Sequence, residues 1–202
     1  KPHTEEEYRR VLGSMLEEID RITNLADNLL LLSRADAGRI EPKREFLEPG
    51  ELAREVCAFL APLAEERDQE LRVAAESPVQ VAADRRLLRQ ALVNLVDNAI
   101  KYGPEKEEIR VIVARRRKEA VIEVTDRGPG IAPEHQEKVF DRFHRVDPAR
   151  SRRRQGTGLG LAIARWSLEV QGGRIELESG PGRGSLFRIV LPAGSLDRKA
   201  DR

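Results

Sequence analysis

Four short motifs in the second half of the chain combine carboxamides, a carboxylate and many glycines. They are residues 94–101, 126–131, 140–145 and 156–163, in that order. Carboxamide oxygens suit Mg²⁺, and a glycine-rich segment ahead of a helix exposes backbone N–H groups to phosphate. Together the motifs predict a nucleotide pocket with a polar helix face, an acid on a tight glycine turn, a mobile lid and a phosphate loop.

The first motif places three polar side chains on one face of a helix. Asn94, Asn98 and Lys101 stand at i, i+4 and i+7, and such positions share a face. Mg²⁺ accepts a carboxamide oxygen and completes its shell with water and phosphate oxygens, while a lysine adds a point charge for phosphate. A solvated polar stripe explains this motif equally well by itself, and the later motifs decide for the pocket.

The second motif is an acid followed by glycines. Asp126 ends an apolar strand, and Gly128 and Gly130 follow it. A carboxylate here can accept a hydrogen bond from an exocyclic amine, which favours adenine over guanine, and the glycines let the backbone approach a flat base. An Asp-Gly turn is common, so the motif is weak alone.

The fourth motif predicts a phosphate loop, although a glycine run alone is often only a flexible loop. Gly156, Gly158 and Gly160 precede a proline-free helix, and the N–H groups and partial positive charge of a helix N-terminus stabilise an anion. The loop is not a Walker motif, because no Gly-Lys-Ser/Thr follows.

Residues 131–155, between the glycine motifs, are predicted to form the lid. Phe140 and Phe143 are its expected apolar anchors, and Arg145 is available for phosphate. A lid stays mobile until a ligand holds it. An arginine cluster in the lid can also meet phosphate or an acidic partner, although solvated loop arginines are the simpler interpretation: Arg150, Arg152, Arg153 and Arg154.

These motifs need a scaffold, and the apolar pattern predicts one. Thr4 and Glu7 form a capping box ahead of a long amphipathic helix that ends near Gly38. Asp84 is the expected N-cap of the helix that carries Asn94. Further helices are expected from residue 51 to about 66 and over 158–170, and strands over 44–47, 70–75, 78–82, 109–114, 120–125, 174–179 and 185–191.

The fold class predicted from these elements is α+β. We expect a two-layer α/β sandwich, a mixed sheet covered by helices on one face, preceded by the long amphipathic helix. The expected domains are residues 1–38, the helical segment, residues 39–192, which carry the four motifs, and residues 193–202, a polar disordered tail.

Composition bounds the functional classes. The chain has 202 residues, 35% charged and 40% hydrophobic, with a net charge of +1, which fits a soluble globular protein and argues against a large nucleic-acid footprint. Cys57 is the single cysteine and is expected to be a small apolar residue in a helix. The first residue is Lys1, so we expect a piece of a longer protein, with any membrane anchor upstream.

The order and spacing of the motifs resemble the ATP-binding catalytic domain of bacterial sensor histidine kinases, in the superfamily shared with gyrase, heat-shock chaperone and mismatch-repair ATPases. The resemblance implies ATP and Mg²⁺ as cofactors. It implies that Asn98 holds the metal and that Asn94, Lys101 and Arg145 form the catalytic set beside the phosphates.

The same resemblance implies the rest of the pocket. Tyr102 would border the base, and Asp126 would read the adenine amino group. The remaining binding residues implied by the resemblance are Gly128, Gly130, Ile131, Phe140, Gly156, Thr157, Gly158, Leu159, Gly160 and Leu161.

The resemblance also implies partners. Residues 29–38 look like the end of the second helix of the family's dimerisation hairpin, which implies a homodimer, ATP or ADP as ligand and the receiver domain of a response regulator as protein partner. The implied location is the cytoplasmic portion of an inner-membrane sensor. His3, His135 and His144 lack the context of a phosphate acceptor, so the acceptor histidine is expected upstream and the chain is not expected to label itself.

Two alternatives stay open. A serine/threonine kinase of the anti-sigma type shares this pocket, although the helical hairpin end argues against it. A degenerate scaffold without nucleotide is the second, and the intact Asn98, Asp126 and glycine set argues against it. Gyrase-like ATPases carry a glutamate base where this chain has Asn94, which cannot take a proton at neutral pH, so phosphoryl transfer is favoured over hydrolysis.

Overall fold

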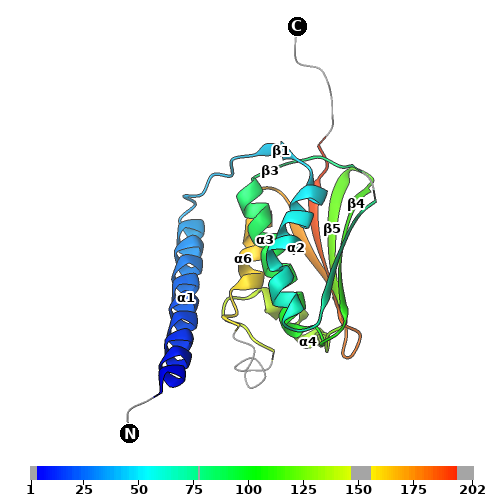
Figure 1. Ribbon diagram of the computed structural model, residues 1–202. Helices are drawn as coiled ribbons and strands as arrows, with labels where there is room; N and C mark the ends of the chain where they lie inside the picture. Colours follow the sequence, from blue (N-terminus) through cyan, green and yellow to red (C-terminus); the bar gives the residue numbers. More distant parts are fainter. Residues whose placement is uncertain (1–3, 77, 147–155, 195–202) are drawn as a thin grey trace. The chain divides into compact units, whose positions relative to one another are not determined.

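The computed structural model describes residues 4–76, 78–146 and 156–194. The chain divides into two compact units, residues 1–41 and residues 42–202, and Figure 1 labels their elements. Each unit is described by itself below.

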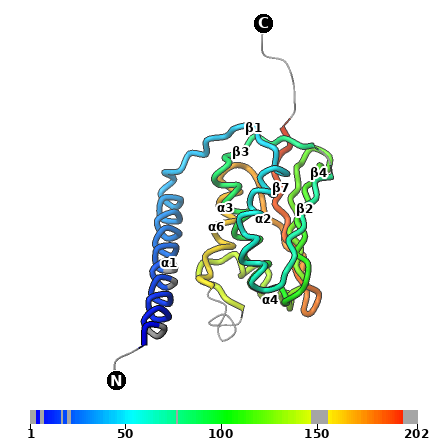
Figure 2. Tube along the Cα trace, in the orientation of Figure 1, coloured from blue at the N-terminus to red at the C-terminus, as the bar shows by residue number. Residues whose placement is uncertain are grey.

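The first unit is one long helix, as expected. Helix α1 spans Glu5–Asp36, 32 residues, and Figure 2 traces it as an uninterrupted helical tube. Gly38 follows it with a φ of +61°, a left-handed conformation that commonly ends helices. The apolar stripe is exposed along its length, at Tyr8, Val11, Leu12, Met15, Leu16, Ile19, Ile22, Leu29 and Leu30.

The second unit contains the sheet and its covering helices. Its helices are α2 (Pro49–Glu65), α3 (Arg85–Tyr102), the short α4 (Pro133–Gln136), the 3₁₀ helix η1 (Lys138–Phe140) and α6 (Gly160–Glu169). Its strands are β1 (Glu45–Leu47), β2 (Glu70–Ala75), β3 (Val81–Ala83), β4 (Glu108–Arg116), β5 (Glu119–Asp126), β6 (Arg174–Ser179) and β7 (Ser185–Pro192).

Five strands form one mixed sheet in the order β2-β4-β5-β7-β6. β2 runs parallel to β4, and the other neighbouring pairs are antiparallel. Helices α2, α3 and α6 cover one face of this sheet (Figure 1), which confirms the two-layer sandwich. One strand differs from expectation: β3 begins at Val81 and pairs with β1 in a separate two-stranded sheet, because the proline-containing segment before it makes no ladder.

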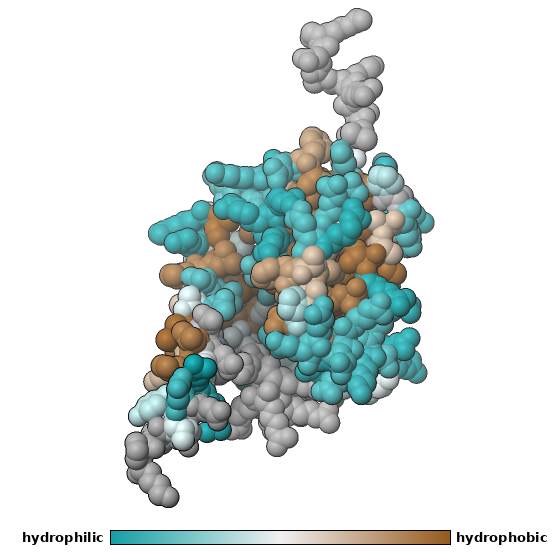
Figure 3. Space-filling view, in the orientation of Figure 1, coloured by the Kyte–Doolittle hydropathy of each residue, from teal (hydrophilic) through white to brown (hydrophobic). Residues whose placement is uncertain are grey.

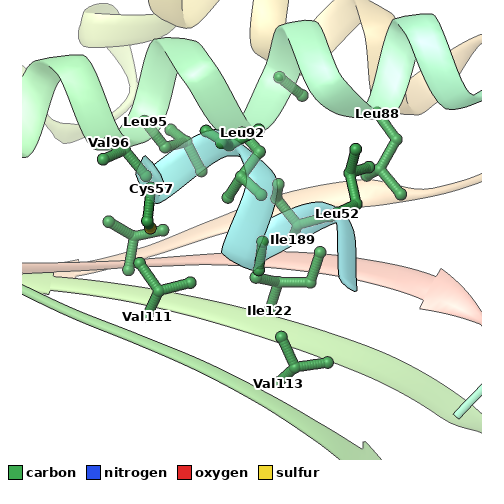
Figure 4. Packing of buried hydrophobic residues seen from close by; sticks show 14 of the residues in the cluster. Leu52, Cys57, Leu88, Leu92, Leu95, Val96, Val111, Val113, Ile122 and Ile189 are labelled. Atoms are coloured by element: carbon green, nitrogen blue, oxygen red, sulfur yellow. The ribbon is translucent and has the colours of Figure 1, made fainter. Parts of the chain in front are cut away.

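The core lies between the sheet and the three helices. Leu92 and Leu95 from α3 point toward Ile122 and Ile189 from the sheet (Figure 4), and all four are at most 1% exposed. Cys57 of α2 is also buried, and burial raises its pKa to about 11. The expectation of a small apolar role for Cys57 is confirmed.

The surface of the second unit is polar. Most of its visible face is hydrophilic (Figure 3), in line with the 35% of charged residues.

Part of the expected tail belongs to the ordered fold. Ala193 N donates to Lys118 O and Gly194 N to Gln80 O, so these two residues continue the fold; residues 195–202 lie outside the described part. Within the described ranges, no helix combines the length and apolar character that a membrane span requires.

Candidate nucleotide-binding site

Helix α3 begins at the predicted cap. Asp84 Oδ1 accepts from Arg86 N at 2.9 Å and Leu87 N at 3.2 Å, and Oδ2 accepts from Lys43 N at 2.8 Å. Burial raises the pKa of Asp84, but these N–H donors outweigh it, and the net shift is downward. The capped helix then presents its apolar face to the core.

The polar face of α3 carries the first motif. Leu95 and Val96 are fully buried, whereas Asn94, Asn98 and Lys101 are half-buried on the surface side. Lys101 bonds to Asp97, one turn earlier on the same face. Asp97 was not predicted as a member of the site, although its i, i+4 spacing to a lysine is a readable signal.

Asn94 faces the start of α6. A Cβ built on Gly160 would lie 3.3 Å from Asn94 Oδ1. Asn94 Nδ2 is buried and has no hydrogen-bond partner in the described structure. A buried donor without a partner is rare in folded proteins, so this amide is available to a ligand between α3 and the phosphate loop.

No side chain of the described residues caps the start of α6. Leu159 occupies the N-cap position, is fully buried and offers no polar side chain to the first turn. Thr157 Oγ1 accepts from Leu159 N at 3.4 Å. In the described residues, the N–H groups of the first turn of α6 itself receive no side-chain cap. These groups suit an anion.

Asp126 is buried at the end of β5. It is 6% exposed, and its Oδ1 accepts from Gly128 N at 2.7 Å. Burial raises the pKa of Asp126, opposed by hydrogen bonds from the N–H groups of Gly128 and Ser185. A buried carboxylate with spare acceptor capacity can read an amine.

The loop after Asp126 is braced by the turn between β6 and β7. Gly130 has a φ of +72° and packs against Gly180 O, and Gly184 has a φ of +73° and packs against Asp126 O. Side chains at these positions would collide with backbone, which explains why glycine is required. The sequence analysis left residues 180–184 between two expected strands and gave them no part in the site.

Two further residues that the sequence analysis missed hold this loop. Ser179 Oγ accepts from Ile131 N at 2.8 Å, and Gln136 Nε2 donates to Ser179 O at 2.9 Å and to Ile131 O at 3.0 Å. No spacing rule marks a serine or glutamine for this work, since the partners are 48 and 43 residues apart.

Tyr102 connects the two glycine motifs. A Cβ built on Gly156 would lie 3.2 Å from its hydroxyl, and one built on Gly128 would lie 2.9 Å from its carbonyl oxygen. The last residue of α3 therefore stands between the Asp126 turn and the phosphate loop. Residues 94–102, 126–131 and 156–160 thus converge on one side of α3.

The lid is only partly as predicted. Phe140 is half-buried and makes an edge contact with Phe187, with ring centroids 6.4 Å apart, so it anchors the lid. The expectation for Phe143 is wrong: it is 58% exposed with a φ of +62°. This backbone turn lets Phe143 N donate to Gly158 O at 2.9 Å, which joins the lid to the phosphate loop through the main chain.

The remaining predicted residues divide into two groups. Ile131 and Leu161 pack against the core, and Arg145 has a buried Nε without a hydrogen-bond partner among the described residues. The arginines at 150, 152, 153 and 154 lie outside the described residues. In the described ranges, no three His, Cys, Asp or Glu side chains come together as a metal site.

The chain is similar to proteins of a known family. The family model described as "Histidine kinase-, DNA gyrase B-, and HSP90-like ATPase" matches residues 83–195. The sensor protein IrlS of Burkholderia pseudomallei is 36% identical over 96% of this chain and 41% of its own length. The sensor-like histidine kinase SenX3 of Mycobacterium tuberculosis is 42% identical over 93% of this chain and 46% of its own.

A solved structure extends the agreement. Full-length ShkA in complex with AMPPNP matches with a TM-score of 0.82 and 28% identity, over 96% of this chain and 40% of that chain. The chain spans less than half the length of the two curated relatives named above. The family match covers the capped helix, the acid turn and the phosphate loop in one stretch, and the chain therefore belongs to the histidine kinase-, DNA gyrase B- and HSP90-like ATPases, as an ATP-binding catalytic region of the sensor histidine kinase type.

Proposed function

We propose that this chain binds Mg-ATP in the site beside α3 and transfers the γ-phosphate to a histidine that is none of His3, His135 and His144. From there the phosphate passes to an aspartate of a response-regulator receiver domain. The observation that carries the proposal is the unpartnered, buried Nδ2 of Asn94 beside Gly160 and the uncapped start of α6.

The residues present fit the nucleotide and the metal. Asp126 accepts the adenine amine, and Tyr102 borders the base between the two glycine motifs. Asn98 supplies a neutral oxygen ligand, and Lys101 and Arg145 supply positive charge for the phosphates. Asn98 would hold Mg²⁺, which would supply positive charge close to the phosphates.

The chain favours transfer to a delivered nucleophile over hydrolysis. Asn94 stands where a base would have to act, and a carboxamide neither accepts nor releases a proton at neutral pH. The site therefore binds and orients but does not activate water. An imidazole nitrogen needs no such activation, since its neutral form already carries a lone pair.

The proposal extends to assembly and location. The exposed apolar stripe of α1, which includes Leu12, Leu16 and Ile19, would be covered by helices of a dimerisation hairpin in a homodimer. The region would act on the cytoplasmic side, with any membrane contact made by other segments of the protein.

The test is a calorimetric titration of the chain with ADP, with and without Mg²⁺, and with GDP as the base control. We expect saturable binding of one ADP per chain, stronger with Mg²⁺, and at least about tenfold weaker binding of GDP. Absence of heat together with absence of thermal stabilisation by ADP would overturn nucleotide binding.

Transfer is tested separately. Incubated with labelled ATP, the chain alone should stay unlabelled, while a dimerisation hairpin from a relative added in trans should acquire an acid-labile label. An acid-stable label would indicate a hydroxyl acceptor and the serine/threonine kinase alternative.

A further inference from the structure

A buried glutamine forms hydrogen bonds with backbone carbonyls at the end of α3. Gln69, which immediately precedes β2, is only 5% exposed. Its Nε2 donates to Ile100 O at 3.2 Å and to Pro104 O at 2.9 Å. The last carbonyls of a helix lack intrahelical partners, and one side-chain amide here satisfies a carbonyl on each side of the helix terminus.

Arg67 adds a third contact to the same segment. Its Nη2 donates to Gly103 O at 3.1 Å, and its backbone oxygen accepts from Lys106 N at 3.3 Å. A Cβ built on Gly103 would lie 3.2 Å from Gln69 Nε2 and 2.5 Å from Ala99 O. Because Gly103 has no side chain, the backbone after α3 can pass close to the carboxamide of Gln69.

Tyr102 lies between Ile100 and Pro104, the two residues whose carbonyls Gln69 binds. Its carbonyl lies against Gly128 and its hydroxyl against Gly156, as the close approaches of 2.9 and 3.2 Å to a built Cβ show. A shift of the last turn of α3 would therefore move both contacts together. Asn94 lies eight residues earlier, about 12 Å along the helix, and Asn98, the proposed metal ligand, lies one turn before Tyr102. The last turn itself carries Lys101, so its loosening reaches the lysine but leaves the two asparagines in place.

We propose that Gln69, assisted by Arg67, is a positioning residue for the base end of the nucleotide pocket. The inference rests on the proposed nucleotide binding. Without the amide, the carbonyls of Ile100 and Pro104 lose their donor in a buried setting, the last turn loosens, and Tyr102 no longer closes the space between the glycine motifs. The affinity supplied by the base and by Lys101 in the same turn falls, and the contribution of Mg²⁺ at Asn98 stays.

The test compares Gln69→Leu with a matched control in the whole chain. Gln171 is equally buried, at 3% exposed, and also bonds backbone at helix ends, from Nε2 to Ser167 O at 2.6 Å and from Asp84 N to Oε1 at 2.9 Å. It contacts the start of α3 and the end of α6, away from Tyr102. Gln171→Leu therefore removes comparable hydrogen bonds without touching the base end.

The readouts are ADP affinity, the ratio of affinities with and without Mg²⁺, and the thermal midpoint. For Gln69→Leu we expect ADP affinity to fall about tenfold with the Mg²⁺ ratio unchanged. For Gln171→Leu we expect a similar loss of thermal midpoint and an ADP affinity within about twofold of the parent.

Arg67→Met is the second variant, in case Gln69→Leu does not fold. It should lower ADP affinity about threefold, again with an unchanged Mg²⁺ ratio. Parental ADP affinity in the folded variants, or equal losses in Gln69→Leu and Gln171→Leu, would overturn the positioning role. Failure of the parent chain to bind ADP would instead reject the proposed function.

Discussion

Lys101 and Asp97 form an ion pair one turn apart on α3, with 2.6 Å between Nζ and Oδ2. The acid lies N-terminal to the lysine, the favourable order on a helix. The side chains are 35% and 26% exposed, so the pair is partly screened by water. Lys101 is therefore held on the helix in the free protein, and in the proposed site it would share its charge between Asp97 and phosphate.

Replacing Asp97 by asparagine should strengthen ADP binding about threefold. The change removes a negative charge beside the phosphates and releases the ammonium of Lys101, while an exposed pair contributes only about 0.2–1 kcal/mol to stability. Calorimetry at low and high salt measures the ADP affinity of parent and variant, and the gain in affinity should shrink at high salt. The control is Glu169→Gln, which breaks the i, i+4 pair of Glu169 with Arg165 on α6; weaker binding by Asp97→Asn would mean that Asp97 orients Lys101 productively.

Replacing Asp126 by asparagine should abolish ADP binding without unfolding the protein. The amide is nearly isosteric and can still accept from Gly128 N, but it presents an NH₂ group where the adenine amine needs an acceptor. We expect at least about a hundredfold loss of affinity, measured by calorimetry. Unchanged affinity would refute the role of Asp126.

The same substitution should change how stability depends on pH. Burial is the largest cause of the raised pKa of Asp126, so the ionised carboxylate costs stability above that raised pKa, and the cost disappears as pH falls through it. Asp126→Asn should therefore unfold at a higher temperature than the parent at pH 8, with the difference shrinking toward pH 4. A difference that grows on acidification would contradict this assignment.

Replacing Gly160 by alanine should weaken Mg-ADP binding without loss of stability. The new methyl group would come within 3.3 Å of Asn94 Oδ1 and displace it, at a cost of about threefold to tenfold in affinity. Gly13→Ala is the control, since a Cβ there meets nothing within 4 Å and alanine favours an exposed helix. Equal Mg-ADP affinities in the two variants would mean that Asn94 does not contribute to phosphate binding.

Replacing Asp84 by alanine should lower the free energy of unfolding by about 2 kcal/mol. The variant loses the acceptor for Arg86 N, Leu87 N and Lys43 N. Because these donors hold the pKa of Asp84 below its ordinary value, its contribution is present above the ordinary pKa and is lost as pH falls through the lowered one. Urea unfolding at pH 7 and pH 3 should show a smaller difference between parent and variant at pH 3.

Cys57 should resist thiol reagents in the native protein. Its side chain is 5% exposed, and burial raises its pKa to about 11, so the reactive thiolate is scarce at pH 8. A colourimetric thiol titration should show no fast reaction until denaturant is added. Rapid labelling of the native chain would mean that α2 opens easily from the sheet.

The sequence predicts those features of the fold that follow from local pattern. Strand and helix periodicity places the elements that carry Asn94 and Asp126, and Asp84 is readable as a cap because its side chain acts on N–H groups two and three residues away. The parallel pairing of β2 with β4 is not readable, because it depends on α3 crossing between them.

The site was predicted less completely for the same reason. Glycine spacing and the acid indicate the proposed pocket. Gln69, Gln136 and Ser179 form hydrogen bonds with backbone 31 to 48 residues away, and no local sequence pattern predicts such contacts. Phe143 shows the opposite error: its hydropathy indicated an anchor, whereas its φ of +62° turns the main chain toward Gly158 and leaves the ring exposed.

Two turns that are distant in sequence depend on each other for their shape. Gly130 packs against Gly180 O, and Gly184 packs against Asp126 O. A graft of residues 126–131 from a relative would arrive without the surface that shapes it, and a graft of residues 180–184 alone would displace the recipient's own acid. Chimaeras that alter base preference in this region therefore have to exchange both turns at once.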